Sequence, residues 1–370
     1  MQIPQVSPWI GETERAAVER VLLSNWITEG PSSAEFSAKL NTLIGTPYGV
    51  FAPNGTLALY LGLLAAGIGS AAEVLVPDIT FIASANAVVM AGATPVFVEV
   101  NADNYQIDVA KCGHLITEHT RAIMPVHLYG MMANMTEVMA FAREHSLIVI
   151  EDAAQALGVR YHAQHAGTFG EIGCFSFFAD KTITTGEGGY VVCRSQAYYE
   201  RLRLLRNQGR LDRGSFIHPA LGYNFRITDL QAAIGLAQLA KLDVITERKR
   251  AILAWYRREL AGLPDVQFLR VEPGSEYVPF RAILICPDAH GLMAYLKQHD
   301  IQPRTFFYPL HKQPCFAQLA KAHGGAQDLD DAHFPNAIYG YEHGVALPIF
   351  PTLAEAAVVQ ICATIRDFYA

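Results

Sequence analysis

Several sequence features are missing from this chain, and each absence argues against one class of protein. No Cys-x-x-Cys spacing occurs among its six cysteines, which lie mostly in apolar runs, so we expect buried thiols in a reducing compartment and no metal site. No basic run occurs and the formal net charge is −7, which argues against nucleic acid as a partner. Residues 57–69 are apolar but too short to cross a bilayer, and residues 1–8 lack the charged start and apolar middle of a signal peptide. We therefore expect a cytoplasmic protein without a membrane partner.

Apolar residues, in contrast, are plentiful. They make up 51% of 370 residues, which predicts a large core and two structural lobes. Apolar runs with the character of strands alternate with runs of helical period from Glu12 to about Arg206. The expected strands lie near Tyr48, Val74, Pro95, Ala122 and Leu147. This alternation is typical of an α/β fold with a mostly parallel sheet that helices cover on both faces.

The last third of the chain follows a different pattern. Leucine and isoleucine recur at helical spacing from Thr228 to about Leu260, which predicts a long helical connector whose apolar stripe serves packing. Beyond it we expect an α+β lobe with strands at residues 266–268 and 278–285 and helices at residues 290–299 and 353–368. The expected division is a large domain at residues 1–245, which includes the N-terminal segment, and a small domain at residues 246–370.

The segment from Cys174 to Gly189 places a lysine, Lys181, among apolar residues. An ammonium in apolar surroundings is poorly solvated, so its pKa falls and the free amine can attack a carbonyl or hold an aldehyde as a Schiff base. A lone lysine at the end of a strand more often keeps its charged group in water. The neighbouring motifs decide between these two interpretations.

A carboxylate is expected close to this lysine. Residues 147–150 form an apolar run that continues into Glu151 and Asp152. This pattern is typical of a buried parallel strand that ends at the carboxyl edge of the sheet, where open α/β sheets bind ligands. An aspartate there can pair with a protonated heterocyclic nitrogen, such as the pyridinium of pyridoxal phosphate. The alternative is that Asp152 caps the N-terminus of a helix.

An anion site is predicted where a short strand leads into a helix. Gly55 and Thr56 follow the strand and precede a helical run at residues 57–66, and the free N–H groups of a helix N-terminus bind phosphate. An Asn-Gly-Thr turn is by itself common. Ser176 could add its hydroxyl to the same phosphate. Phe81 is a candidate to stack on a ring, although an aromatic residue in such a run is more often part of the core.

These motifs together resemble the DegT/DnrJ/EryC1/StrS family of sugar aminotransferases, which are fold-type-I pyridoxal-phosphate enzymes, and among them the GDP-perosamine synthase type. The resemblance is carried by seven segments that run in order over nearly the whole chain. They are residues 26–30, 54–56, 76–96, 124–130, 150–155, 176–189, and 222–226 with 229–239. The resemblance implies a large cofactor-binding domain with a mostly parallel sheet and a smaller C-terminal α+β domain.

The resemblance also implies a role for each matching residue. Lys181 would hold pyridoxal 5'-phosphate as a Schiff base and move protons, Asp152 would pair with the pyridinium nitrogen, and Gln155 would contact the ring oxygen. The other expected cofactor contacts are Phe81 to the ring, Gly55, Thr56 and Ser176 to the phosphate, and Asn224 to the phosphate from the other subunit of a homodimer. The expected substrate contacts are Trp26, Thr28, Glu187, Arg226 and His311. No metal is implied.

Two positions depart from the perosamine-synthase type. Gln155 stands where glutamate is frequent, and Ala179-Asp180 stand where Gly-Asn is frequent. The first concerns a contact to the cofactor, and the second leaves the sugar undetermined. The loop at residues 209–219 is either a solvated face or part of a diphosphate site. Its basic residues include Arg210, Arg213 and His218.

The expected activity is a transamination in two halves. An amino donor, by the resemblance L-glutamate, leaves its nitrogen on the cofactor as pyridoxamine 5'-phosphate. The nitrogen then passes to a keto carbon, C4 by preference, of a 4-keto-6-deoxy sugar linked to a nucleotide, with GDP as the first choice and UDP or dTDP close behind. Such a product implies a place in lipopolysaccharide O-antigen biosynthesis.

Other activities stay open at this stage. A 3-keto nucleotide-sugar aminotransferase has the same motifs, and a sugar dehydratase of the family typically carries histidine in place of Lys181. Different pyridoxal-phosphate chemistry on the same fold, such as desulfuration or aldol cleavage, would not need a sugar pocket. A regulatory protein that binds the cofactor without catalysis is the remaining alternative, and Lys181, Asp152 and Gln155 together argue against it.

Overall fold

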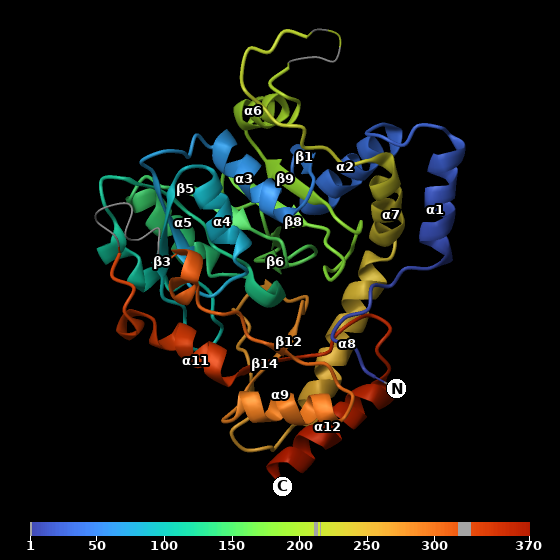
Figure 1. The fold of residues 1–370 in the computed structure, drawn as a ribbon, viewed down its shortest axis with the longest axis vertical. Coiled ribbons are helices and arrows are strands. Elements are labelled where there is room, and N and C mark those ends of the chain that lie inside the picture. Colours follow the sequence, from blue (N-terminus) through green and yellow to red (C-terminus); the bar gives the residue numbers. More distant parts are fainter. Residues whose placement is uncertain (1, 211–213, 215, 317–326) are drawn as a thin grey trace.

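A seven-stranded sheet forms the centre of the larger lobe in the computed structural model, which describes residues 2–210, 214, 216–316 and 327–370 (Figure 1). Its strand order is β1-β9-β8-β5-β4-β2-β3, and every strand except β9 runs in the same direction. The strands are β1 (Tyr48–Ala52), β2 (Glu73–Pro77), β3 (Thr94–Val98), β4 (Thr120–Ile123), β5 (Ile148–Asp152), β8 (Ile172–Ser176) and β9 (Gly189–Cys193). The prediction of a mostly parallel sheet is confirmed.

Helices cover both faces of this sheet because strand residues alternate between two apolar cores. Val74 and Ile150 face one core, while Leu75 and Val149 face the other. On the first face lie α3 (Gly55–Ala65), α4 (Ala83–Met90) and α6 (Gln196–Arg206). On the second face lie α2 (Pro31–Ile44) and α5 (Met135–Glu144). The short 3-10 helices of the larger lobe are η1 (Val109–Lys111), η2 (Gly113–Leu115) and η3 (Leu128–Gly130).

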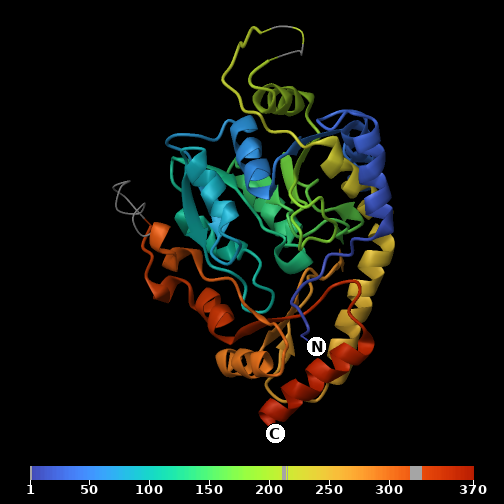
Figure 2. The ribbon, with the colours of Figure 1, turned by 45° about the vertical axis from the view of Figure 1, so that its right-hand side comes forward.

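The predicted long connector is two helices, α7 (Asp229–Leu239) and α8 (Leu242–Glu259), which follow one side of the molecule (Figure 2). Lys241 leaves helical geometry between them, with φ −104° and ψ 2°, and its Nζ lies 2.6 Å from Glu14 Oε1 on α1 (Glu12–Leu23). Although burial acts to raise the pKa of Glu14, hydrogen bonds, first from Lys241, lower it to about 2. The predicted helical connector is therefore present, but it is interrupted by a turn at residues 240–241, where Lys241 meets a buried carboxylate on a distant helix.

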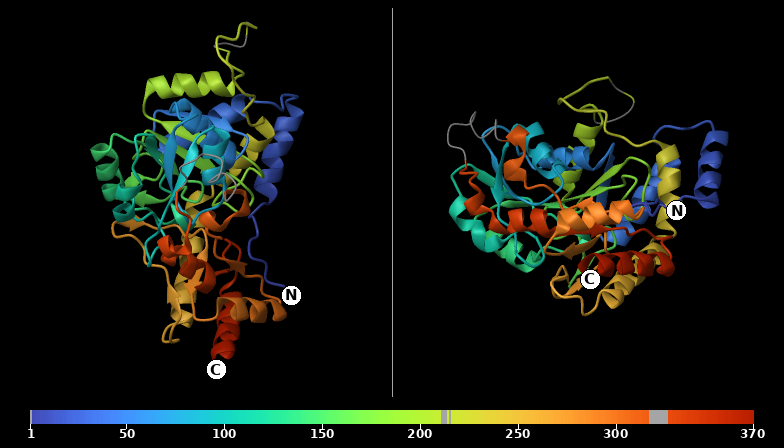
Figure 3. Two further views of the ribbon diagram at one scale, coloured as in Figure 1. Left: turned by 60° about the vertical axis from the view of Figure 1, so that its left-hand side comes forward. Right: turned by 60° about the horizontal axis from the view of Figure 1, so that its bottom comes forward.

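The smaller lobe lies at one end of the molecule and contains a four-stranded antiparallel sheet (Figure 3). Its strands, in the order of the sheet, are β10 (Gln267–Phe268), β12 (Ala282–Ile285), β14 (Gly344–Leu347) and β13 (Arg304–Thr305). Its helices include α9 (Ala289–Gln298), α11 (Pro335–His343), α12 (Glu355–Tyr369), η4 (Leu310–Lys312) and η5 (Asp331–His333). The strand expected at residues 278–285 is shorter than predicted, because Val278 and Phe280 instead pack against the cores of the larger lobe.

Two further contacts join the lobes. A three-stranded sheet combines β6 (Arg160–Tyr161) and β7 (Gln164–His165) with β11 (Ser275–Glu276), which comes from the second half of the chain. At the N-terminus, Ile3 pairs with Ile301, and the Gln5 side-chain amide donates a hydrogen bond to the Leu347 carbonyl. The first residues therefore lie on the smaller lobe. Residue 245, the predicted domain boundary, falls inside α8.

The helices and the cysteines have one further property each. Among the described residues, no helix combines the length and the apolarity that crossing a bilayer requires. The six cysteines are free thiols, five of them buried, while Cys315 is exposed.

Candidate active site

The candidate site lies at the carboxyl edge of the central sheet. β5 ends in Asp152, its neighbour β8 ends in Ser176, and Lys181 follows Ser176 on a turn. The turn is fixed by hydrogen bonds within it: the amides of Lys181 and Thr185 donate to the carbonyls of Phe178 and Phe177, respectively. Because adjacent parallel strands bring their carboxyl ends to one edge, the predicted carboxylate, hydroxyl and amine all belong to this edge.

Lys181 lies in a poorly solvated place, as the sequence indicated. Its side chain is 14% exposed, and its Nζ lies 4.5 Å from the centre of the Phe280 ring and 3.9 Å from Asp180 Oδ1. Burial lowers the pKa of Lys181, and the negative charges of Asp180 and Asp152 only partly offset this effect. A larger share of this lysine is therefore a free amine at neutral pH than of an exposed lysine, which favours its use as a nucleophile.

Asp152 is a buried carboxylate without a paired cation among the described residues. Its Oδ2 accepts a hydrogen bond of 2.7 Å from Ser84 Oγ, and its Oδ1 accepts one of 3.1 Å from the Ala154 amide. Burial raises the pKa of Asp152 despite these hydrogen bonds and the charge of Lys181. A protonated ring nitrogen beside it would restore the charged form. Residues 153–159 form turns and no helix, so the interpretation of Asp152 as a helix cap is wrong.

A cradle for an anion forms where α3 begins. Asn54 caps α3, its Oδ1 accepting from the Leu57 amide at 2.9 Å, and Gly55 and Thr56 occupy the first turn, where backbone N–H groups lack helical partners. A Cβ placed on Gly55 would lie 2.8 Å from Ser176 Cβ and 3.1 Å from its Oγ. Only glycine therefore lets the Ser176 hydroxyl approach the helix N-terminus. The predicted phosphate residues come together.

Gln155 and Phe81 fit the surroundings of a flat ring. The Gln155 side chain is buried and its Oε1 accepts from the Tyr129 amide at 2.7 Å, which leaves Nε2 as the group that can donate to a ring oxygen. Phe81 is 54% exposed and lies 6.2 Å from Phe307, ring centre to ring centre. The interpretation of Phe81 as an ordinary core residue is therefore wrong.

Asn224, the remaining expected phosphate contact, is exposed. Its backbone pairs with Asn207, whose side chain accepts a hydrogen bond of 2.8 Å from Arg226. In the adjoining loop, Arg210 lies over the Phe216 ring, and His218 Nδ1 is 2.7 Å from the Gln208 carbonyl. Arg213 lies outside the described residues. A diphosphate-binding role of this loop stays a prediction.

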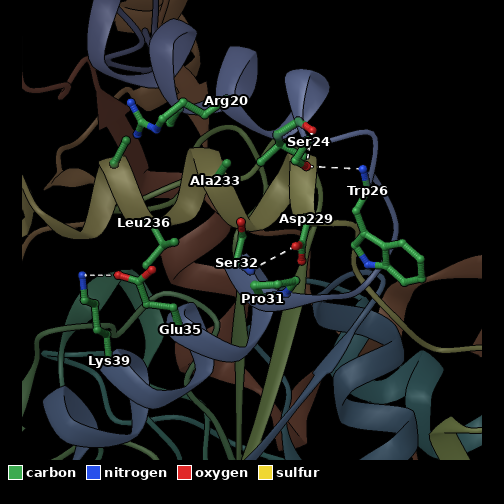
Figure 4. A pocket seen from close by; sticks show the side chains of 13 residues that line it. Arg20, Ser24, Trp26, Pro31, Ser32, Glu35, Lys39, Asp229, Ala233 and Leu236 are labelled. Carbon is green, nitrogen blue, oxygen red and sulfur yellow. Dashed lines mark hydrogen bonds and ion pairs between the residues drawn. The ribbon is translucent and has the colours of Figure 1, made fainter.

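Two of the expected substrate residues lie on or beside a hollow between α1, α2 and α7 (Figure 4). Trp26 lines this hollow, whose volume is about 690 Å³, and its indole nitrogen donates to the Glu29 carbonyl at 3.2 Å. The Thr28 carbonyl accepts from the Asp229 amide at 3.2 Å. Asp229, which the sequence analysis did not single out, caps α2 by accepting hydrogen bonds from the amides of residues 30, 32 and 33. Lys181 is not part of this lining.

The remaining substrate candidates differ in exposure. Glu187 is exposed, and its carbonyl accepts from Thr185 Oγ1 at 2.6 Å. His311 is buried: its Nδ1 lies 2.6 Å from Asp78 Oδ2, its amide donates to Asp78 Oδ1 at 2.7 Å, and its ring stacks on Phe334. His311 therefore joins the smaller lobe to the residue that follows β2. Contact of its ring with a sugar stays a prediction.

Sequence reasoning missed three side chains that act on the site. Ser84 binds Asp152, while Lys249 and Arg281 are buried close to Lys181. Arg281 Nη2 lies 2.6 Å from Oδ2 of Asp180, which the sequence marked only as a departure from the perosamine-synthase type. No local pattern marks Ser84, Lys249 or Arg281, because each reaches the site from a different segment. The one sequence feature that pointed to this cluster was Asp180, which stands where asparagine is frequent in the perosamine-synthase type.

Comparisons with known proteins find relatives of similar sequence and similar fold. The sequence profile of the DegT/DnrJ/EryC1/StrS aminotransferase family matches residues 8–366. A GDP-perosamine synthase of Escherichia coli O157:H7 is 37% identical over 99% of this chain and 98% of its own. A UDP-N-acetyl-3-dehydro-alpha-D-glucosamine 3-aminotransferase of Acidithiobacillus ferrooxidans is 38% identical over 91% of this chain and 88% of its own. The structure of Spr1654, a putative sugar aminotransferase of Streptococcus pneumoniae solved in PLP and PMP forms, superposes with a TM-score of 0.93 at 26% identity, covering 100% of this chain and 98% of that one.

The Gly55–Ser176 contact yields a direct test of the cradle. In Gly55→Ala, the new methyl group displaces Ser176 from the helix N-terminus, so we expect the dissociation constant of pyridoxal phosphate to rise about tenfold, a loss of about 1.4 kcal/mol. Fluorescence titration of the cofactor-free protein measures it. Gly113→Ala is the matched control, because a Cβ there meets nothing within 4 Å. Unchanged cofactor affinity in Gly55→Ala would contradict the assignment of the cradle.

Proposed function

This chain belongs to the DegT/DnrJ/EryC1/StrS aminotransferase family, and from that premise we propose that it transfers an amino group from L-glutamate to C4 of a nucleotide-linked 4-keto-6-deoxy sugar. It is a pyridoxal-phosphate-dependent sugar aminotransferase. The observation that carries the proposal is the meeting of three features at one sheet edge: the buried Lys181 amine, the Asp152 carboxylate and the Gly55–Ser176 cradle.

The residues present suit this cofactor. Asp152 would hold the pyridinium nitrogen, Gly55, Thr56 and Ser176 would hold the phosphate, Gln155 would donate to the ring oxygen, and Phe81 would cover a ring face. The space that a Cβ on Gly55 would fill and the buried carboxylate of Asp152 support this assignment independently of each other. When bound, the cofactor supplies an aldehyde that accepts and returns an amino group and a ring that withdraws electrons from the reacting carbon.

The chain's own groups then have distinct tasks. Lys181 would hold the cofactor through Nζ and, once released, would take the proton from the α carbon of the amino donor. In the second half, the same Nζ would deliver a proton to the sugar carbon that receives the nitrogen. Asp152 would provide the negative charge that the ring nitrogen needs, and its hydrogen bond from Ser84 holds the carboxylate in place.

The position of the keto group is the finer part of the proposal. C4 is favoured because a relative named GDP-perosamine synthase aligns over 99% of this chain, while the 3-aminotransferase relative aligns over 91%. That second relative, at 38% identity, makes C3 the competing assignment. The reacting carbon is the one placed within reach of Lys181 when the diphosphate is anchored, so a displacement of the sugar by one carbon changes the product.

We also propose that two subunits share each site. Asn224 is exposed and lies in a segment that includes the exposed apolar residues Phe216, Ile217 and Leu221. Such a surface suits a second copy of this chain, which would place Asn224 at its neighbour's cofactor phosphate.

The free cysteine thiols support the cytoplasm as the place of the reaction.

The role of Lys181 can be located chemically. Reduction of the loaded protein with borohydride should fix the cofactor on Lys181, as read by peptide mass spectrometry, and Lys181→Ala should lower kcat by about 10³-fold or more, because the amine acts both as a nucleophile and as an acid–base group. Lys297→Ala is the control, since Lys297 is an exposed lysine on α9 of the smaller lobe. Finding the adduct on another lysine would overturn the assignment.

The aminated carbon can be identified only in the reaction product. Incubation with L-glutamate and a GDP-linked 4-keto-6-deoxy sugar should yield 2-oxoglutarate and an amino sugar whose new C–N bond is at C4 by NMR. A parallel incubation with a UDP-linked 3-keto sugar serves as the comparison, with kcat/KM expected to be at least about tenfold lower. Nitrogen at C3, or turnover with the 3-keto sugar alone, would replace the C4 assignment and leave the aminotransferase assignment intact.

Sharing of the site predicts complementation. In a heterodimer of Lys181→Ala with Asn224→Ala, one site combines the intact Lys181 with the intact Asn224, whereas the other carries both defects. After random exchange of subunits in an equal mixture, we therefore expect about a quarter of the wild-type activity. Native mass spectrometry measures the exchange. If exchange occurs and no activity returns, Asn224 acts within its own chain or not at all.

A further inference from the structure

Three cationic side chains surround one buried ring beside the site. Lys181 Nζ and Arg281 Cζ each lie 4.5 Å from the centre of the Phe280 ring, and Lys249 Nζ lies 5.8 Å from it. Phe280 and Lys249 are buried, and the Arg281 side chain is 5% exposed. Cations so far from water repel one another strongly, so the cluster needs a negative charge.

Asp180 supplies that charge. Its Oδ2 lies 2.6 Å from Arg281 Nη2 and 3.7 Å from Arg304 Nη1. Asp180, Lys181 and Lys249 also line one small cavity of about 20 Å³, so these three residues border a common enclosed space. Asp152 is the other carboxylate whose charge acts on Lys181. A single carboxylate is therefore the immediate counter-charge of the whole cluster.

The two oxygens of Asp180 are used unequally. Arg281 holds Oδ2, whereas Oδ1 is sealed from solvent and accepts no hydrogen bond from any described residue. The Lys181 ammonium lies 3.9 Å from Oδ1, which is just beyond hydrogen-bonding distance. A buried carboxylate oxygen without a donor is costly, so a small rotation of the lysine side chain toward Oδ1 would be favourable.

We propose that Asp180, fixed by Arg281, is a positioning residue that receives the Lys181 amine through Oδ1 whenever the amine is free of the cofactor, and that it thereby controls the amine's protonation. The inference rests on the proposed role of Lys181. During turnover the lysine must be released and must later return, and a fixed anion keeps the released amine close and stabilises the ammonium that forms once the amine has taken up a proton. Lys249 acts in the opposite sense, since its positive charge disfavours a second ammonium nearby.

The charges around Lys181 and Lys249 determine whether each substitution favours or disfavours the Lys181 ammonium. Lys181 faces Asp180, Asp152 and Arg281, and Lys249 faces Arg281, Asp180 and Lys181. Burial, followed by the charge of Arg281, lowers the pKa of Lys249 to about 7. Removing the Asp180 charge destabilises the Lys181 ammonium and frees the amine at lower pH. Removing Lys249 stabilises the same ammonium under conditions where Lys249 is itself charged, which means below about pH 7.

The test measures the Lys181 amine directly and without turnover. The protein is loaded with pyridoxamine phosphate, which leaves Lys181 free, and is labelled with trace acetic anhydride at a series of pH values. Labelling of Lys181 is then read by mass spectrometry against exposed Lys39 in the same sample. We expect Asp180→Asn to label about tenfold faster than wild type below the midpoint of the curve, and Lys249→Met to label more slowly below about pH 7.

Two comparisons separate positioning from a structural role. The pH profile of kcat should move with the labelling curve in Asp180→Asn, while KM for the sugar stays unchanged, and thermal unfolding shows whether the variant folds. Asp180→Ser, which is smaller and uncharged, replaces Asn if that variant does not fold. Wild-type labelling in the Asp180 variant, or shifts of the same sign in both variants, would overturn the proposal. Failure of borohydride to fix the cofactor on Lys181 would instead overturn the proposed function and leave the labelling result interpretable.

Discussion

The site depends on keeping the amine of Lys181 and the carboxylates of Asp152 and Asp180 away from water at the end of a parallel sheet. Desolvation disfavours the charged form of each group, and it acts in opposite directions on the pKa of Lys181 and on that of Asp152. The same burial therefore makes Lys181 a better nucleophile, and it means that a nearby cation is required to stabilise the charged form of Asp152. A cofactor that carries a carbonyl and a protonated ring nitrogen satisfies both groups, which is why the apolar surroundings and the chemistry of the site cannot be separated.

The smaller lobe completes these surroundings. Phe280 and Arg281 lie directly before β12, and Lys249 lies on the connecting helix α8, yet all three enclose a lysine that follows β8 of the larger lobe. His311 adds a second bridge through Asp78, directly after β2. The position of the lobes thus sets the electrostatics of the amine, and a change in their packing would alter the reactivity of Lys181 as well as access to it.

Parts of this arrangement could be predicted because they have local signals. The strand periods, the acid at the end of residues 147–152, and the Gly55-Thr56 turn all indicate positions on one sheet edge, and the structure brings them there. The break at Lys241 and the pairing of Asp180 with Arg281 could not be predicted, because each depends on a partner about 100 residues or more away. The strand β9 was not among the expected strands, and its antiparallel direction follows from the path of the chain and not from composition.

The two halves of the function rest on different parts of the molecule. Of the expected cofactor contacts, Asp152, Gln155 and Ser176 are buried, and Gly55 fits closely against Ser176, so substitutions there are constrained by packing. Of the expected substrate contacts, Trp26 and Glu187 are exposed, whereas His311 is buried against Asp78. Substitutions at exposed positions such as Trp26 and Glu187 leave the packing around Lys181 undisturbed. Relatives with similar identity to this chain bear names with different nucleotide sugars, which a separation of this kind would allow.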